Sequence, residues 1–387
     1  MSIRFSLKLV YMICNCIVSE MRIASGSPSS LLDDVMASCH QYHAELACLS
    51  CMRPAGDDVF GRFTRTIMSL AALRASNAKA FRALPAGCTG VFVGGTSGIG
   101  YAMAEAFASS SQEATVIIVG RNKGAAETLF NSLRASGTKG QYEFIECDAT
   151  LMKNVKQAGE AILDRHSKIH FLVFTQGFMS FDGHTPTVEG IDRKLALNYY
   201  SRFRFIRDLL PALRKGYEED GIGKVESVLR AGKGGPIDSY MDDLGLKDHY
   251  STMTVARAAP TYNDLMMEVG KSYSSCASAN EWQKCASLNP SLSFIHTWPG
   301  VVASNMLTSS TSTIISAGGR IFSPLVNLLF TSTQDSAQYM WHALHTYGAG
   351  TSRVGSRGEI LSQDSYFGSK EQVERLWQHS ETMTHLE

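Results

Sequence analysis

The sequence predicts an α/β protein built on one doubly wound parallel sheet of about seven strands. Two observations carry this prediction. From Thr89 onward, short apolar runs rich in valine and isoleucine alternate with longer segments of helical periodicity, which is typical of parallel βαβ units. Runs such as Val-Ile-Ile-Val at residues 116–119 also lack polar alternation, so they suit strands that are buried on both faces.

The expected elements follow one another along the chain in strand–helix order. The clearest helical patterns cover residues 191–213 and 262–273. Because ligands in such sheets bind beyond the carboxyl ends of the strands, we expect the functional residues at that edge. The expected strands lie at residues 90–93, 115–119, 142–145, 171–174, 225–229, 292–296 and near 359–361.

Composition narrows the class of protein. With 387 residues, 44% of them hydrophobic and 19% charged, the chain matches an ordinary globular protein with a large core. Lys plus Arg balance Asp plus Glu at 36 each, so we expect no nucleic acid and no acidic membrane surface as a partner.

The first 67 residues differ from the rest, and we expect them to form a poorly ordered extension to a domain at residues 68–387. Their apolar run at residues 9–18 is about half of a membrane-spanning helix, so we expect no stable span. The run resembles a poor signal peptide, but Asn15 interrupts it and Glu20 follows it. Met68 is a candidate natural start because an amphipathic segment begins there.

Cysteines are concentrated in this extension. The total of nine cysteines is odd, and the four that lie outside the extension are scattered. This pattern indicates free thiols in a reducing compartment, and we expect the protein in the cytoplasm. One cluster has the residue types of zinc ligands, although its spacing fits no known pattern, so we predict no metal site. Its members are Cys39, His40, His43, Cys48 and Cys51.

The segment that organises the domain is Val-Phe-Val-Gly-Gly-Thr-Ser-Gly-Ile-Gly at residues 91–100. An apolar strand ends in glycines and an alanine-rich helix follows. Gly94, Gly98 and Gly100 allow a tight turn, close approach of the backbone to a pyrophosphate, and close packing of helix on strand. The free N–H groups of the helix start would face the phosphates. This order favours a dinucleotide site over a plain glycine-rich loop.

This motif resembles the cofactor loop of the short-chain dehydrogenase/reductase family, and the resemblance extends over roughly residues 86–363. It implies a Rossmann-type fold that binds a nicotinamide dinucleotide. Within the loop, the implied cofactor-binding residues are Gly94, Thr96, Ser97, Gly98, Ile99 and Gly100.

The end of the second strand bears on the choice of cofactor. Arg121 and Asn122 stand where an NAD-preferring site would place an acid, and a cation there suits the 2′-phosphate of NADP(H). No acid lies beside Arg121 in the sequence. A solvated surface arginine is the alternative, and NADP(H) is the cofactor that we expect.

Further positions match the family after later strands. The resemblance assigns Asp148 to the adenine, Gly177 to close backbone approach, and Asn198 to the water that leads to the catalytic lysine. Pro299 and Ser304 match its Pro-Gly motif, with Ser304 as the hydroxyl partner of the nicotinamide amide. The family's Asn-Asn-Ala-Gly is here Phe-Thr-Gln-Gly at residues 174–177, so the asparagines are lost.

The catalytic pattern of the family is incomplete. Its Tyr-x-x-x-Lys is best matched by Tyr262, which we expect to open the helix after the fifth strand, but Met266 occupies the lysine position. The serine position falls on Arg230 or Ala231. Bringing a phenol from a pKa of about 10 to about 7 requires roughly 4 kcal/mol, so a cation is needed.

We expect Arg230 or Arg257 to supply that cation beside Tyr262, with Asn198 completing the site. Tyr262 as an ordinary helix-start aromatic is the alternative. Tyr250 is a second candidate, but Thr254 follows four residues later, so it does not restore the motif.

Residues 305–330 contain Gly318-Gly319 and an apolar run, which suits either a lid over a hydrophobic substrate or ordinary packing and an oligomer contact. We predict an NADP-dependent oxidoreductase that transfers hydride between nicotinamide and a carbonyl or alcohol of a small apolar metabolite, as in fungal reductases of secondary metabolism that the chain resembles. The alternatives are a catalytically degenerate protein that binds the dinucleotide for a structural or sensing role, and a non-redox enzyme that uses the cofactor as a template. A homo-oligomer also remains open.

Overall fold

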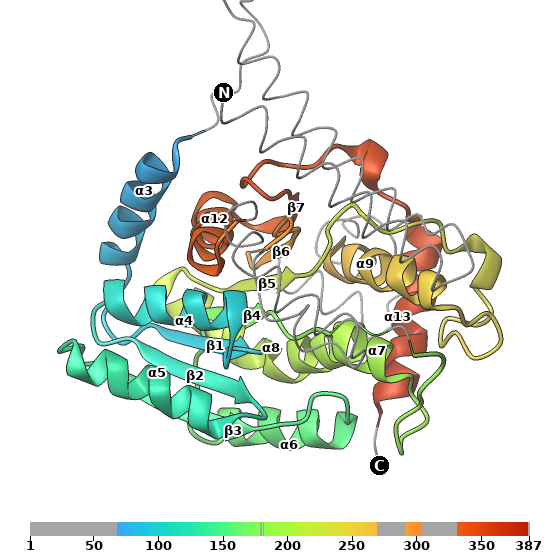
Figure 1. Cartoon of the computed structure of the whole chain (residues 1–387), viewed down its shortest axis with the longest axis horizontal. Coiled ribbons are helices and arrows are strands. Elements are labelled where there is room, and N and C mark those ends of the chain that lie inside the picture. Colours follow the sequence, from blue (N-terminus) through green and yellow to red (C-terminus); the bar gives the residue numbers. More distant parts are fainter. Residues whose placement is uncertain (1–67, 179, 181, 269–290, 303–330, 386–387) are drawn as a thin grey trace, which may run out of the picture. The chain divides into compact units, whose positions relative to one another are not determined.

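A computed structural model describes residues 68–178, 180, 182–268, 291–302 and 331–385 of the chain. Seven parallel strands form one sheet in the order β3-β2-β1-β4-β5-β6-β7 (Figure 1). This confirms the predicted fold class. The strands are β1 Thr89–Val93, β2 Thr115–Gly120, β3 Gln141–Glu146, β4 Phe171–Phe174, β5 Lys224–Val228, β6 Ser293–Thr297 and β7 Gly350–Val354.

The central strand β1 explains why the sheet is so apolar. All five of its residues are buried, because β2 pairs with one side, β4 with the other, and helices cover both faces. Val91 pairs with Ile117 of β2 and with Leu172 of β4. Successive strands are added outward in one direction from β1 to β3 and in the opposite direction from β4 to β7. Ligands in such sheets bind at this switch point between β1 and β4.

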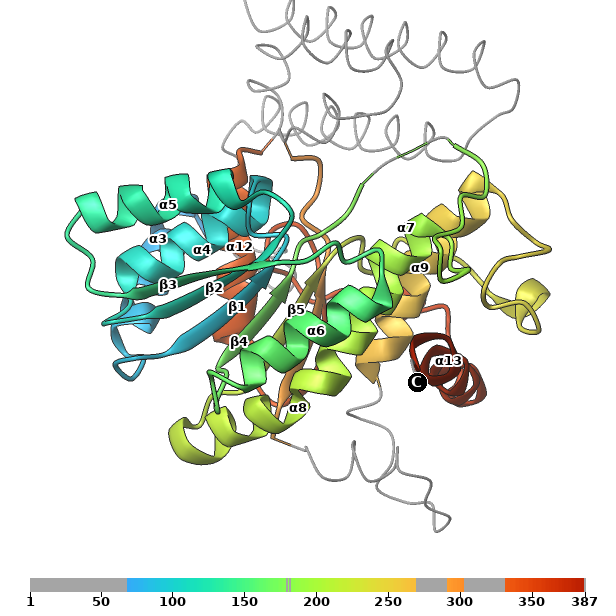
Figure 2. The ribbon, with the colours of Figure 1, turned by 90° about the horizontal axis from the view of Figure 1, so that it is seen from below.

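Helices cover the two faces of the sheet as separate layers (Figure 2). One core cluster packs α6, α8, α9 and α13 on one face, and a second packs α3, α4, α5 and α12 on the other. The described α-helices are α3 Leu70–Arg82, α4 Gly98–Ser110, α5 Lys123–Ala135, α6 Met152–Leu163, α7 Arg193–Leu195, α8 Ser201–Asp220, α9 Thr252–Glu268, α12 Thr333–Thr346 and α13 Lys370–Thr384. A π-helical turn, Ala196–Tyr200, joins α7 to α8.

Helix boundaries follow local chemistry. Ser69 caps α3 by accepting a hydrogen bond from the N–H of Ala72. At α13, Ser369 and Gln372 exchange side-chain and backbone hydrogen bonds in a capping box. The amphipathic segment expected from Met68 is therefore a helix that begins at Leu70.

Two expectations about elements were wrong. The last strand is β7 at Gly350–Val354 and not residues 359–361, where Ile360 makes only an isolated antiparallel bridge to Val354. The helix after β5 begins at Thr252, well before Tyr262. In both cases a polar stretch, Gly-Thr-Ser-Arg or Thr-Met-Thr, forms regular structure because tertiary neighbours pair with it or pack against it.

Several expectations fall outside the described residues: the extension at residues 1–67 with its cysteine–histidine cluster, and the lid at 305–330. Among the described helices none is long and apolar enough to cross a membrane, and the described side chains form no group that could hold a metal ion. Cys88 and Cys147 are buried free thiols, and burial raises the pKa of each to about 12.

Candidate functional site

The glycine turn between β1 and α4 packs directly against the segment that follows β4. Gly94 has a φ of +89°, and a Cβ on it would lie 2.5 Å from the backbone nitrogen of Gln176. A Cβ on Gly100 would collide with Thr175 Oγ1 and with the carbonyl of Gly94. Both positions therefore need glycine so that turn, helix and neighbouring strand can meet.

Gly98 serves a different purpose, because open space lies where its Cβ would be. Its φ is +60°, and α4 begins at this residue. Ser97 is the N-cap, yet its side chain makes no capping hydrogen bond. Ser97 therefore leaves the first N–H groups of α4 uncapped, and these groups with the positive end of the helix dipole would suit a pyrophosphate.

A cavity of about 620 Å³ lies at the carboxyl ends of β2 and β3, and residues of α6 complete its lining. Arg121 and Asp148, two of the residues that we expect to bind a cofactor, both line it. The carboxylate of Asp148 accepts hydrogen bonds from the backbone N–H and the hydroxyl of Thr150, at 3.0 and 2.8 Å, so its orientation is set by the chain that follows β3.

The cavity also contains an acid that the local sequence around Arg121 does not reveal. Glu146, the last residue of β3, lines the same cavity because it pairs in register with Gly120. Asn122 uses its side-chain oxygen to cap α5 through the N–H of Ala125 at 3.0 Å. Its direct part in holding a cofactor therefore stays a prediction.

The remaining loop residues lie at the turn itself. Thr96 approaches Gly120, where a Cβ would lie 3.0 Å from the methyl group of Thr96, so the glycine turn contacts the end of β2. Ile99 is half-buried and packs against the core on the α4 face. Both positions are consistent with a turn whose backbone, and not its side chains, faces the ligand.

At the end of β4, Gly177 and Asn198 lie against each other. A Cβ on Gly177 would sit 3.2 Å from Asn198 Oδ1. That oxygen is buried and has no hydrogen-bond partner among the described residues, whereas the carbonyl of Asn198 accepts from Asn263 Nδ2 at 2.9 Å. Asn198 lies in the π-helical turn, a geometry found often at functional sites.

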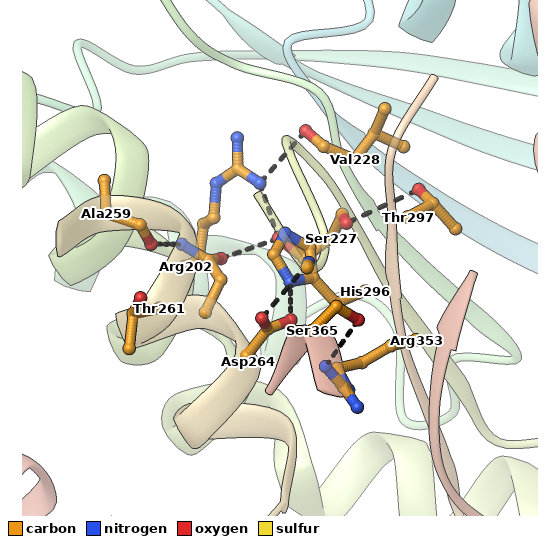
Figure 3. Close-up of polar contacts among 12 residues, drawn as sticks. Arg202, Ser227, Val228, Ala259, Thr261, Asp264, His296, Thr297, Arg353 and Ser365 are labelled. Atoms are coloured by element: carbon orange, nitrogen blue, oxygen red, sulfur yellow. Dashed lines mark hydrogen bonds and ion pairs between the residues drawn. The ribbon is translucent and has the colours of Figure 1, made fainter. Parts of the chain in front are cut away.

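A fully buried arginine ties these segments together (Figure 3). Arg202 of α8 donates to the carbonyl of Gln176 at 2.5 Å, to Ser227 Oγ at 2.5 Å and to the carbonyl of Val228 at 3.1 Å. Ser227 in turn donates to Asn263 Oδ1 at 2.7 Å. Burial lowers the pKa of Arg202 to about 9. The ends of β4 and β5 are therefore held by one cation.

A buried Asp–His pair supports the loop after β5. His296 Nδ1 of β6 lies 2.6 Å from Asp264 Oδ1 of α9, and the two side chains are at most 1% exposed (Figure 3). The second oxygen of Asp264 accepts from the N–H of Gly232 at 3.2 Å. Asp264 therefore anchors the loop that contains Arg230, one of the residues expected at the catalytic site.

Tyr262 lies elsewhere than expected. It is in the middle of α9, 0% exposed, and its hydroxyl donates to the carbonyl of Leu244 at 3.0 Å. Burial raises its pKa well above the usual range. Its ring belongs to the core cluster that packs α6, α8, α9 and α13, and Arg230 is half-buried in the loop after β5.

Another tyrosine does meet a cation at the carboxyl edge. Tyr250, two residues before α9, is half-buried, and its hydroxyl accepts a hydrogen bond from Lys194 Nζ at 2.8 Å while it donates to the carbonyl of Gly183 at 3.0 Å. Lys194 is not among the residues that the sequence predicts, because the motif places the lysine four residues after the tyrosine. Lys194 instead belongs to α7 and lies 56 positions from Tyr250. The available signal was its place one helical turn before Asn198.

The chain after β6 completes the edge. The N–H of Trp298 donates to the carbonyl of Val354 at 2.8 Å, and Gly300 has a φ of +73°. Pro299 lies between them in the expected turn. Lys233 Nζ stands 4.4 Å from the centre of the Trp298 ring, which joins the loops after β5 and β6. Ser304 lies outside the described residues.

A doubly wound parallel sheet with a glycine turn before α4 defines a dinucleotide-binding class of protein. The family model described as short chain dehydrogenase matches residues 89–227, from β1 into β5. The chain belongs to the short-chain dehydrogenase/reductase family.

Curated relatives agree with this membership. The oxidoreductase AN1596 of Emericella nidulans is 38% identical over 63% of this chain and 66% of its own length. The oxidoreductase andH of Emericella variicolor is 32% identical over 56% of this chain and 58% of its own length. The chain thus spans about two thirds or less of these relatives.

The fold has a counterpart among solved structures. An uncharacterised protein from Mycobacterium paratuberculosis superposes with a TM-score of 0.51 at 17% identity, covering 79% of this chain and 96% of that one. At this identity the likeness concerns the fold alone.

Proposed function

We propose that the protein is an NADP(H)-dependent oxidoreductase that acts on a carbonyl or alcohol of a small, rather apolar metabolite. One observation carries the proposal: the glycine turn before the uncapped start of α4 contacts the end of β2, and Arg121 and Asp148, which follow β2 and β3, line one cavity. These residues would hold the pyrophosphate, the 2′-phosphate and the adenine. The bound nicotinamide supplies or accepts hydride at the substrate carbon.

The preference for NADPH depends on two opposed charges in one cavity. Arg121 is exposed and able to reach a 2′-phosphate, whereas the Glu146 carboxylate would repel it. A hydrogen bond to a charged group contributes about 1.5–3 kcal/mol, which corresponds to a preference of roughly ten- to a hundred-fold. We propose that the attraction of Arg121 for the 2′-phosphate outweighs the repulsion by Glu146, because the ribose in such sites binds at the end of β2 and not at the end of β3.

Titration of the full chain with NADPH and with NADH, followed by tryptophan fluorescence, tests the proposal. Arg121→Ser should weaken NADPH binding by about ten- to a hundred-fold and leave NADH nearly unchanged. Arg82→Ser, an exposed arginine of α3, is the matched control and should change neither affinity. Failure of the wild-type chain to bind either dinucleotide would end the proposal.

The proton donor that this function needs is better supplied by Tyr250 than by Tyr262. Reduction of a carbonyl requires a hydroxyl that reaches the substrate oxygen. Tyr250 is half-buried at the edge where strands β4 and β5 end, and Lys194 contacts its hydroxyl. Tyr262 would have to leave a core position and its bond to Leu244.

A pair of phenylalanine variants separates this function from a dinucleotide sensor. Tyr250→Phe should keep NADPH affinity and lose about 10²- to 10⁴-fold in kcat, the usual contribution of a general acid. Tyr262→Phe should lower stability with little effect on kcat. The substrates are a panel of aldehydes and ketones that includes 9,10-phenanthrenequinone, with NADPH consumption as the readout. NADPH binding without reduction of any of them would favour the sensing role.

The two Emericella relatives that are named oxidoreductases support the reaction class of the proposal. A role in fungal secondary metabolism stays part of the proposal.

A further inference from the structure

We propose that Lys194, in the short helix α7 after β4, is the cation that supports Tyr250 as proton donor. This inference rests on the proposed function. It departs from the expectation that an arginine after β5, Arg230 or Arg257, takes the place of the lysine missing at Met266.

The ammonium group of Lys194 is held from all sides. It donates to the Tyr250 hydroxyl at 2.8 Å, to the carbonyl of Asp182 at 2.8 Å and to the carbonyl of Gly183 at 3.2 Å. The residue is only 5% exposed. Three oxygens thus match the three hydrogens of the ammonium, which fixes its charge next to the phenol.

The start of α7 positions this lysine. Asp192 caps the helix by accepting hydrogen bonds from the N–H groups of Lys194 and Leu195, at 2.9 and 3.3 Å. It also accepts from the N–H of Thr185 at 3.1 Å, which ties the loop after β4 to the same helix. Asp192 is 1% exposed, so this anchor is rigid.

Topology brings the pair to the cofactor edge. In a parallel sheet the helix after each strand begins at the carboxyl edge, α7 after β4 and α9 after β5. Lys194 lies in α7 and Tyr250 just before α9. Asn198, one turn beyond Lys194, lies against Gly177 at the end of β4. The glycine turn at Gly94 packs on the same segment.

Carboxylates, a cation and an imidazole surround Tyr250. Burial and, after it, the carboxylates of Asp192 and Asp182 raise the pKa of Tyr250 to about 12. The other titratable neighbours are Lys194 and His184, whose ring centre lies 5.0 Å from that of Tyr250. The phenol therefore carries its proton at neutral pH, as a proton donor must.

The proposed step balances within the site. When a reduced nicotinamide is bound it would supply hydride to the carbonyl carbon. The Tyr250 phenol would then give its proton to the substrate oxygen as the C=O double bond becomes a single bond, and the products would be an alcohol, oxidised nicotinamide and a phenolate. The phenolate is paired with the Lys194 ammonium until it regains a proton from solvent. Without that charge the phenolate would be left beside two carboxylates.

Two substitutions of Lys194 in the full chain test this role, with NADPH and 9,10-phenanthrenequinone as probes. An adjacent cation shifts a phenol by about 1–3 pKa units, so Lys194→Met should lower kcat by about tenfold or more while KM and NADPH affinity change little. Lys194→Arg keeps the charge and should recover most of the activity. Lys215→Met, an exposed lysine of α8, is the control and should behave as the wild type.

The outcomes are distinguishable. Lys194→Met with wild-type kcat overturns the inference, and so does equal loss in the Met and Arg variants, which would mean that Lys194 only holds the loop at residues 182–183. If the wild type binds no NADPH, the proposed function fails first, and the inference with it.

Discussion

At the scale of single residues, Glu226 is the least expected side chain in the sheet. It lies on β5 with 0% exposure, and neither carboxyl oxygen has a hydrogen-bond partner among the described residues. Burial raises the pKa of Glu226 well above its usual range. Since an isolated buried carboxylate is very costly, the folded chain retains the proton at neutral pH.

Glu226→Gln should therefore change how stability depends on pH. The unfolded chain releases this proton above a pKa of about 4.3, whereas the folded chain keeps it. The stabilisation is fully present below that value and is lost as pH rises toward the folded pKa, by about 1.4 kcal/mol per pH unit. The variant lacks this loss. The free energy of unfolding of the variant minus that of the wild type, measured in urea, should therefore rise from about pH 5 to 8. Glu374→Gln, exposed on α13, should differ from the wild type by a constant amount, and an equally constant difference for Glu226→Gln would contradict the prediction.

At the scale of elements, the turn from β1 to α4 requires glycine at its positions for different structural reasons. Gly98 needs a left-handed backbone beside open space, whereas Gly100 needs the absence of a Cβ between α4 and Thr175. The first demand concerns the ligand and the second concerns packing of the helix on the sheet. A pair of alanine variants separates them.

Gly98→Ala should cost about 1–2 kcal/mol of stability from the left-handed backbone and weaken NADPH binding, because a methyl group enters the space expected for phosphate. Gly100→Ala should cost more, since α4 must move away from Gly94 and Thr175, and should weaken binding as well. Urea unfolding and NADPH titration measure both effects. Gly124→Ala within α5 meets only ordinary contacts and should leave binding unchanged. A Gly100→Ala chain as stable as the wild type would refute this account.

At the scale of the whole molecule, the sheet gathers residues that the sequence separates. Arg202 of α8 holds the ends of β4 and β5, and Asp264 of α9 pairs with His296 of β6. Both contacts lie at the carboxyl edge and join segments far apart in the chain (Figure 3). The rigidity of the candidate site therefore comes from helices of one layer reaching across several strands.

The fold and the cofactor turn could be predicted from the sequence, because both depend on short-range patterns. Apolar runs indicate β1, β2 and β4 to within a residue or two, since strands buried on both faces need continuous hydrophobic side chains. The glycine spacing indicates the turn before α4, since few other residues tolerate its backbone and contacts.

Only the tertiary structure decided the rest, because it depends on contacts between distant segments. The polar edge strand β7 forms by pairing with β6. Glu146 enters the cavity of Arg121 through the register of β3 with β2. Tyr262 sits in the core, although its spacing matches a motif, while Tyr250 meets Lys194 across 56 positions of sequence. A motif specifies residue types at a spacing, whereas the direction of a side chain follows from what packs around it.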